Sequence, residues 1–209
     1  MNSLLPELRY AFYLTVHPFK GFWEIRHEKQ GSVRTSVLLM LLFILTSVSN
    51  GLYNGFLFNQ NGGIHFNVWQ HIAVVLLVYF LWCIANWCLT SLFDGEGTFK
   101  DICKFTSYAL LPLSLVQLIL IPLSHAMSLQ ESSFYMMILN IGIIWTGLLL
   151  FIGMLVTHQY TVLKAALIAV VTLLGMCVII YIMLLFFNLI QQIIGFVITF
   201  WRELSLRMS

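Results

Sequence analysis

The stretch that decides the fold runs from Thr35 to Phe93, TSVLLMLLFILTSVSNGLYNGFLFNQNGGIHFNVWQHIAVVLLVYFLWCIANWCLTSLF, and contains no Asp, Glu, Lys or Arg. A turn-forming cluster, Asn59–Gly63, divides it into two apolar segments, at about residues 35–58 and 69–93. Each segment is long enough for a helix that crosses the hydrocarbon core of a bilayer, which takes about 20 residues. The stretch therefore predicts two membrane spans joined by a turn.

The rest of the 209-residue chain has the same character. Hydrophobic residues make up 60% of it and charged residues 9%, whereas a soluble domain has about 25% charged residues. Further apolar segments run from about Ser107 to Leu123, from about Phe134 to Val156, and onward from about Val162. Lipid offers no partners to free backbone groups, and the segments lack the alternation of a β-barrel. We therefore expect an all-α, polytopic membrane helix bundle of five transmembrane helices, with amphipathic interfacial helices at both ends.

The distribution of Lys and Arg predicts the orientation of the bundle. Basic residues are frequent before the first span, absent after the first and third spans, and present after the second and fourth. By the positive-inside rule, the N-terminus and the loop after the second span are cytoplasmic, and we expect the plasma membrane as the location. The basic residues are Arg9, Lys20, Arg26, Lys29 and Arg34, then Lys100 and Lys104, then Lys164.

The C-terminal region is too long for one upright span. No charged residue occurs from Ala165 to Trp201, a segment that would be about 55 Å long as a helix. We interpret residues 188–209 as an amphipathic tail in the outer interface, following a five-span domain at 35–187. The alternative is a sixth span, which would bring Arg202 and Arg207 to the cytoplasmic side. The polar or small residues of the tail, at helical spacing, are Asn188, Gln191, Gln192, Gly195, Thr199 and Arg202.

Residues 1–34 read as an amphipathic leader that is cytoplasmic or interfacial. Pro18 suits the first turn of a helix and Gly31 suits its end. Phe19, Phe22 and Trp23 fall on one face of that helix, and aromatic residues beside cations suit the headgroup layer. We expect these three aromatic residues to anchor the leader in the membrane. The alternative is a docking helix for a partner protein.

The loop Asp94–Asp101, DGEGTFKD, concentrates glycine and charge between the second and third spans. Thr98 and Asp101 have the spacing of a capping box, which predicts a short helix from Phe99 to about Thr106. The stretch lacks the pattern of a phosphate-binding loop, and an oxygen-ligand cation site is the weaker alternative. We interpret the loop as a capped cytoplasmic turn that offers a charged contact surface to a partner. Its residues are Asp94, Glu96, Lys100, Asp101 and Lys104.

Small and amide side chains inside the spans predict helix packing. Ser47, Gly51 and Gly55 recur four apart in the first span, a spacing that lets helices approach closely, within the bundle or between subunits. Amides inside spans are usually interhelical hydrogen-bond partners, and a polar path for a solute is the alternative. These amides are Asn50, Asn54, Asn86, Gln117 and Asn140.

No pattern in the chain predicts catalysis. The spans contain no acidic or basic residue, and no serine-elbow or zinc-protease motif occurs. The four cysteines include no CxxC pair, so we expect reduced thiols rather than a disulfide or zinc framework. We therefore predict no catalytic residue, no metal and no cofactor. The net charge of +2 is too small to indicate nucleic acid as a partner.

Three motifs resemble the Yip1 family. They are the turn GEGTFKD, the following SYALLPL at Ser107–Leu113, and IIWTGLLLFIGMLVTHQYTVLKA at Ile143–Ala165. The start HPFKGFWEI is similar to the leader of short bacterial members, and the resemblance covers about residues 17–185. It implies a five-span bundle with a cytoplasmic N-terminus. Eukaryotic relatives are trafficking factors that bind small GTPases and carry a long cytosolic N-terminal region, which we do not find in this chain.

We predict a non-enzymatic, multi-pass accessory or scaffold protein of the lipid bilayer. Its partner would be another integral membrane complex, and an ABC transporter is a candidate because some bacterial relatives look like accessory partners of such transporters. Assembly into a homo-oligomer stays open. The alternative function is a small-solute or lipid transport bundle, similar to a channel or a flippase, with the amides of the spans as its polar path.

Overall fold

The computed structural model describes residues 4–28, 30–55, 58 and 66–208, and these residues are helical apart from short links. The expected turn cluster at residues 59–63 lies outside the described residues. Five helical segments are long and apolar enough to cross a membrane, which confirms the predicted all-helical, five-span fold. The elements are α1 (Leu4–Val16), α2 (Pro18–His27), α3 (Val33–Tyr53), α4 (Val68–Leu92), α5 (Phe99–Ala109), α6 (Leu111–Ala126), η1 (Leu129–Glu131), α7 (Ser132–His158) and α8 (Val162–Met208).

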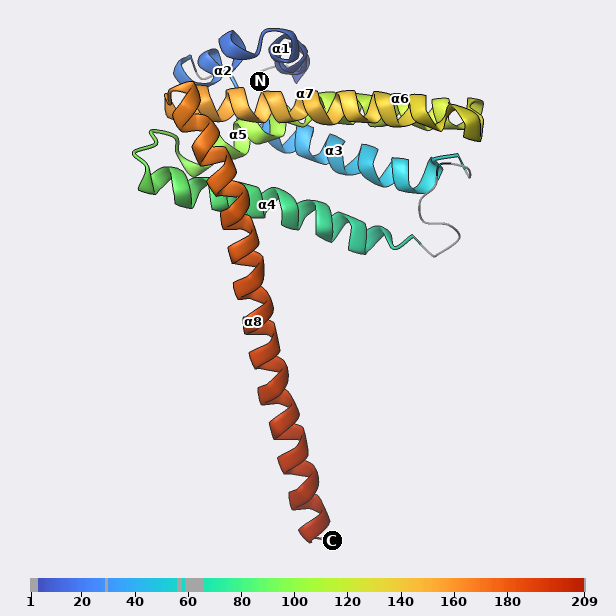
Figure 1. Ribbon diagram of the computed structural model, residues 1–209, viewed down its shortest axis with the longest axis vertical. Coiled ribbons are helices and arrows are strands. Elements are labelled where there is room, and N and C mark those ends of the chain that lie inside the picture. The colour runs from blue at the N-terminus through green and yellow to red at the C-terminus, as the bar shows by residue number, and fades with distance from the viewer. Residues whose placement is uncertain (1–3, 29, 56–57, 59–65, 209) are drawn as a thin grey trace.

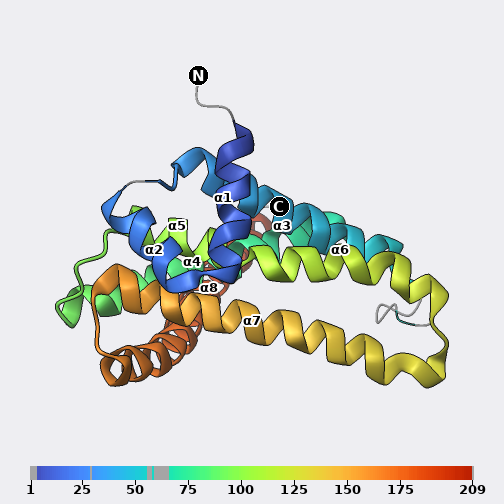
Figure 2. The same cartoon turned by 90° about the horizontal axis from the view of Figure 1, so that it is seen from above.

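Helices α3, α4, α6 and α7 form an elongated bundle with α5 packed between them (Figure 1). The helices of the leader lie across this bundle, α2 on α7 and α1 on α6 (Figure 2). We call the end that holds the leader, the turn at residues 93–98 and the link at residues 159–161 the cap end. The opposite end, where α6 connects to α7, is the far end.

Local sequence explains where the helices begin. The Ser32 hydroxyl accepts a hydrogen bond from the Thr35 amide at 3.1 Å and so caps α3. At α5, the Thr98 side chain bonds to the amide of Asp101 and the Asp101 carboxylate bonds back to the amide of Thr98, which confirms the predicted capping box. The third span therefore begins at Phe99. It is interrupted at Leu110 because Pro112, in the first turn of α6, has no amide hydrogen to continue the helix.

The core lies at the cap end and centres on α5. Ile102, Phe105 and Tyr108, on one face of α5, are fully buried and belong to the same hydrophobic cluster as Leu149 and Met154 of α7. Leu14 and Phe22 from the leader belong to the same cluster. The leader is therefore packed into the bundle and contributes to its core.

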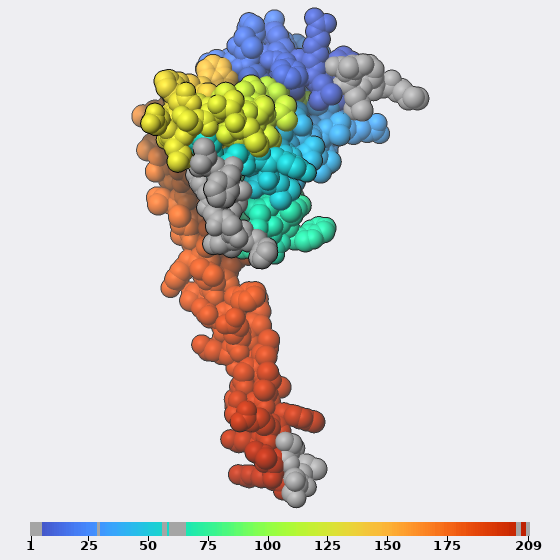
Figure 3. Space-filling model, turned by 90° about the vertical axis from the view of Figure 1, so that its right-hand side faces the viewer, coloured from blue at the N-terminus to red at the C-terminus, as the bar shows by residue number. Residues whose placement is uncertain are grey.

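Helix α8 extends far beyond the bundle (Figures 1 and 3). It runs unbroken for 47 residues, from Val162 to Met208, so the boundary that we expected at residue 188 is not a break in the helix. No proline occurs there, and glycine alone is tolerated in a helix interior at a cost of about 1 kcal/mol. Every residue from Ile180 to Glu203 is exposed. This part of α8 is covered by no other element of the described chain.

Candidate functional site

The turn between α4 and α5, at residues 93–98, is held by close contacts with the ends of α4 and α7. Asp94 has a left-handed backbone (φ 56°), which Asp tolerates better than most residues. The Gly95 amide then donates to the Thr90 carbonyl at 2.8 Å, which folds the turn back onto α4. A Cβ atom at Gly95 would lie 2.5 Å from the Tyr160 hydroxyl and 2.6 Å from His158 Nδ1. The turn needs glycine here because the residues after α7 approach its backbone so closely.

His158, the last residue of α7, is buried under this turn with 1% of its surface exposed. Its Nδ1 accepts a hydrogen bond from the Gly97 amide at 3.2 Å, so the neutral ring carries its hydrogen on Nε2. A Cβ atom at Gly97 would lie 2.6 Å from His158 Cε1. The two glycines of the motif and this histidine therefore form one packed unit. Sequence placed His158 at the end of a span but gave no indication of its contact with the turn.

Tyr160, in the link between α7 and α8, contacts the same turn. Its hydroxyl donates to the carbonyls of Thr90 at 3.3 Å and Phe93 at 3.2 Å, and its ring stacks on His158. Burial, together with the nearby Asp94 carboxylate, raises the pKa of Tyr160, so the hydroxyl keeps the proton that it donates. The Lys164 amine lies 4.7 Å from the centre of the ring. The cap end is thus tied to the beginning of the last span.

Arg26 on α2 attaches the leader to the turn. Its Nη1 donates to Asp101 Oδ2 at 2.8 Å, and its Nη2 donates to the Glu96 carbonyl at 2.8 Å. The same carboxylate oxygen accepts from the Thr98 hydroxyl at 2.6 Å, and Lys104 lies 3.7 Å from the other oxygen. The Asp101 side chain is therefore a structural junction between α2, the turn and α5.

A family model for the Yip1 domain matches residues 12–185, which is most of the chain. The chain belongs to the Yip1 family. The match begins within α1 and ends within α8, so it includes the whole cap end. Yip1 proteins are multi-pass membrane proteins and are generally non-catalytic. Comparison with curated proteins and with solved structures gave no match.

The Yip1 domain uses part of the predicted contact surface internally. Asp101 and Lys104 are half-buried and paired with each other, and Asp101 also binds Arg26. Asp94, Glu96 and Lys100 have exposed side chains. That these residues contact a partner stays a prediction. Sequence reasoning missed Arg26, because nothing in its spacing links it to a residue so far along the chain.

The predicted anchor residues of the leader divide into two groups. Phe19 and Trp23 are 59% and 48% exposed and are free to enter a headgroup layer. Phe22 is 1% exposed and packs in the core with Leu14, so it is not available as a membrane anchor. Helical spacing identified a shared apolar face, but that face turns partly toward the bundle.

The predicted small-residue seam packs inside the chain. Ser47 Oγ lies 2.8 Å from His71 Nε2 on α4, and a Cβ at Gly51 would meet the Phe66 ring at 2.5 Å. Gly55 lies beyond α3, which ends at Tyr53, and its amide donates to the Ser124 hydroxyl of α6 at 2.8 Å. The stretch from Ser47 to Gly55 thus contacts α4, the segment before it, and α6.

The amides of the spans do not form one continuous path. Asn50, Asn54 and Gln117 line a cavity of about 300 Å³ at the far end, with His71 and Tyr135. Asn54 donates to the Tyr135 hydroxyl at 2.7 Å, and Gln117 accepts from Thr46 at 3.2 Å. Asn86 is fully buried beside Met154, and Asn140 is exposed on α7. The described residues include no group of three His, Cys, Asp or Glu side chains that could hold a metal.

Proposed function

We propose that this Yip1 protein is a non-enzymatic accessory or scaffold subunit of another integral membrane complex. The cap end faces the cytoplasm in this proposal, as the positive-inside rule favours, and the plasma membrane is the location. An ABC transporter is the candidate partner that the resemblance suggests. The proposal depends on two surfaces of the chain, one on α8 and one at the cap end.

The observation that carries the proposal is the uncovered distal part of α8. Asn188, Gln191 and Gln192 are exposed, and within the described chain they form no hydrogen bond. Asn188 and Gln192 share a face with Gly195, where a Cβ would meet nothing within 4 Å. Unpaired amides in hydrocarbon are costly, whereas amides and small residues on one face stabilise contacts between membrane helices. A helix of a partner protein would satisfy these amides.

The cap end supplies the second surface. Its backbone is fixed by the contacts of Arg26, His158 and Tyr160, so the exposed side chains of Asp94, Glu96 and Lys100 stand on a rigid support. A rigid charged surface suits recognition, because little side-chain and loop entropy is lost when a partner binds. We propose these three residues as the cytoplasmic contact.

Transport of a small solute or lipid is the second candidate, and the far-end cavity favours it. Asn50, Asn54 and Gln117 converge there with a histidine, as a solute site would require. Toward the cap end, however, the fully buried side chains of Phe105 and Tyr108 fill the interior. We rank transport second because a path would have to pass through this packed region.

The decisive experiment is affinity purification of the intact protein from its native membrane in mild detergent, with mass spectrometry of stoichiometric partners. We expect one membrane complex to co-purify with the wild type and to be lost from the variant Asn188→Leu/Gln191→Leu/Gln192→Leu. The matched control, Ile190→Leu/Ile194→Leu/Val197→Leu, changes another face of α8 and should keep the complex. Recovery of the wild type alone, as monomer or homo-oligomer, would overturn the accessory function and favour a transport bundle.

A further inference from the structure

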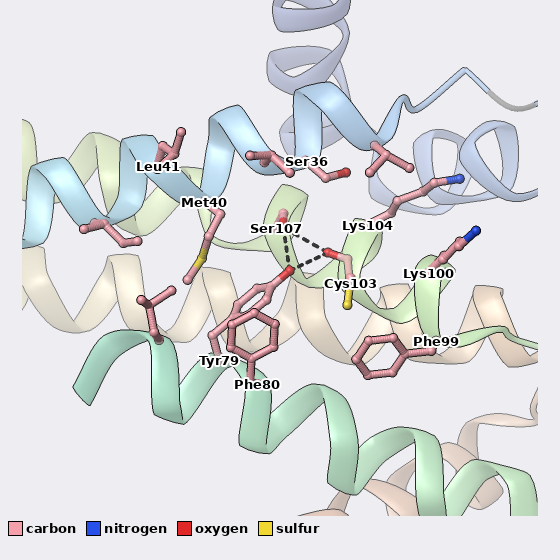
Figure 4. A pocket seen from close by; sticks show the side chains of 14 residues that line it. Ser36, Met40, Leu41, Tyr79, Phe80, Phe99, Lys100, Cys103, Lys104 and Ser107 are labelled. Carbon is pink, nitrogen blue, oxygen red and sulfur yellow. Dashed lines mark hydrogen bonds between the residues drawn. The ribbon is translucent and has the colours of Figure 1, made fainter. Parts of the chain in front are cut away.

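A second cavity, of about 510 Å³, lies between α3, α4 and α5 near the cap end (Figure 4). Its α3 wall runs from Val33 to Ile44, about 16 Å at 1.5 Å per residue. That is about half of the 30 Å hydrocarbon core, the depth of one leaflet. The groove between α3 and α4 therefore has the length that one acyl chain of a lipid occupies.

The wall of this groove is apolar because its few polar groups bond to one another. The Tyr79 hydroxyl donates to the Cys103 carbonyl at 2.9 Å and lies 2.8 Å from the Ser107 hydroxyl (Figure 4). The Ser36 hydroxyl donates to the Ser32 carbonyl of its own helix. Met40 and Phe80 supply flexible and aromatic surface. An acyl chain fits this wall, since no unsatisfied donor or acceptor of these residues faces it.

The groove opens sideways toward the surroundings of the bundle. Val37 and Leu41 of α3 and Phe80 of α4 line it and are about half exposed, at 54%, 55% and 47%. A lipid could therefore enter laterally from the bilayer. The volume is too small for a helix of a partner protein, whose diameter with side chains is about 10–12 Å.

Two lysines stand at the cap-end mouth of the groove. Lys100 and Lys104 are one helical turn apart on α5, and Figure 4 places both amines on the same side of that helix. Lys100 is exposed and forms no ion pair in the described chain. Lys104 and Arg26 both pair with the Asp101 carboxylate, which can neutralise only one of them, so this group of side chains keeps a positive charge in addition to that of Lys100. Glu96, the next acidic side chain on the turn, is exposed and does not line the groove.

We propose that this groove binds an acidic glycerophospholipid, with one acyl chain along α3 and α4 and the phosphate on Lys100 and Lys104. The apolar wall selects for a hydrocarbon chain, and the two amines select for negative charge. This site shares Lys100 with the proposed cap-end contact and no residue with the α8 surface. Lipid binding is measured on the purified protein without a partner, so failure of this proposal can be distinguished from failure of the accessory function.

Native mass spectrometry of the purified full-length protein tests the site, with phosphatidylglycerol and phosphatidylcholine of identical acyl chains as probes. Each lysine near a membrane contributes about 1 kcal/mol toward an anionic lipid, or about fivefold in affinity. We expect the wild type to prefer phosphatidylglycerol and Lys100→Gln/Lys104→Gln to lose roughly 25-fold of that preference. The matched control, Lys20→Gln/Lys164→Gln, removes two other lysines near the cap end and should retain it.

A second variant tests the groove itself. Val37→Trp places a large ring in the groove at a half-exposed position, where it should not prevent folding. We expect it to lose retained lipid of both kinds. Equal retention of the two lipids by the wild type, an unchanged preference in the double lysine variant, or full retention by Val37→Trp would each overturn the proposal.

Discussion

Arg26 Nη1 lies 2.8 Å from Asp101 Oδ2, although the two residues are 75 positions apart in the chain. Their side chains are 22% and 18% exposed, so solvent screens the pair only in part. Since the same carboxylate also caps α5 through Thr98, the pair joins the leader to the third span. This contact makes the leader a folded part of the bundle.

Removing either partner should therefore weaken the attachment of the leader, which its buried residues Leu14 and Phe22 still hold against the bundle. We expect Arg26→Gln and Asp101→Asn each to destabilise the protein in detergent by about 1.5–3 kcal/mol, the range for hydrogen bonds to charged groups. The double variant should lose less than the sum, because the two residues are coupled. Thermal unfolding and the rate of proteolysis between α2 and α3 measure the effect. Lys20→Gln, at a largely exposed ion pair, is the control, and strictly additive losses would contradict a direct contact.

The glycines of the turn give the second prediction. Gly97→Ala should destabilise the protein by about 1–3 kcal/mol, since the new Cβ would overlap the buried ring of His158. The matched control is Gly147→Ala on α7, where the added Cβ meets nothing within 4 Å and alanine favours the helix. Thermal unfolding in detergent distinguishes the two. If both variants unfold at the same temperature as the wild type, the Gly97 backbone does not pack closely against the His158 ring.

Sequence predicted the parts of this fold that depend on neighbouring residues. The span count follows from long apolar segments, and the capping box follows from Thr98 and Asp101 three positions apart. Sequence could not predict Arg26 as a partner of Asp101, since only the tertiary fold brings them together. Helical spacing placed Phe22 on an apolar face of the leader helix, but spacing alone does not show whether such a face packs against the core or against the membrane. At residue 188, polar side chains suggested a boundary, but no residue there ends a helix.

The seam at Gly55 gives the third prediction. We expect Gly55→Leu to lower the unfolding temperature without changing the oligomeric state, because its side chain would collide with the backbone of Ser124 within the same chain. Size-exclusion chromatography with light scattering, together with thermal unfolding, measures both quantities. Gly147→Leu introduces the same side chain at an open position and is the control. A change in oligomer with unaltered stability would instead place the seam between subunits.

Glu7 gives a pH-dependent prediction. Hydrogen bonds from the Ser32 and Thr35 hydroxyls lower the pKa of this carboxyl below its ordinary value of 4.5, and Arg34 adds to the effect. A depressed folded-state pKa means that the contact stabilises the protein above the unfolded pKa and is lost as pH falls through the folded one. The hydrogen-exchange protection factors of the α1 amides, which are corrected for the intrinsic pH dependence of exchange, should therefore fall below about pH 4.5 in the wild type. In Glu7→Gln these protection factors should already be lower at neutral pH and should vary less with acid.

The course of α8 gives the last prediction. A helix that lies in an interface needs a wide polar face, whereas α8 is apolar on nearly all sides from Ala165 to Trp201. In the structure α8 runs crosswise to α3, α4, α6 and α7 (Figure 1). We expect it to turn in the bilayer, so that it crosses the membrane and carries its end to the outside, even though it exceeds one bilayer thickness. In a cysteine-free background, an impermeant maleimide should label Ser128→Cys and Arg207→Cys in intact cells. Glu96→Cys, at the cap end, should react only after permeabilisation. If Arg207→Cys also requires permeabilisation while Ser128→Cys does not, α8 ends on the cytoplasmic side and does not cross.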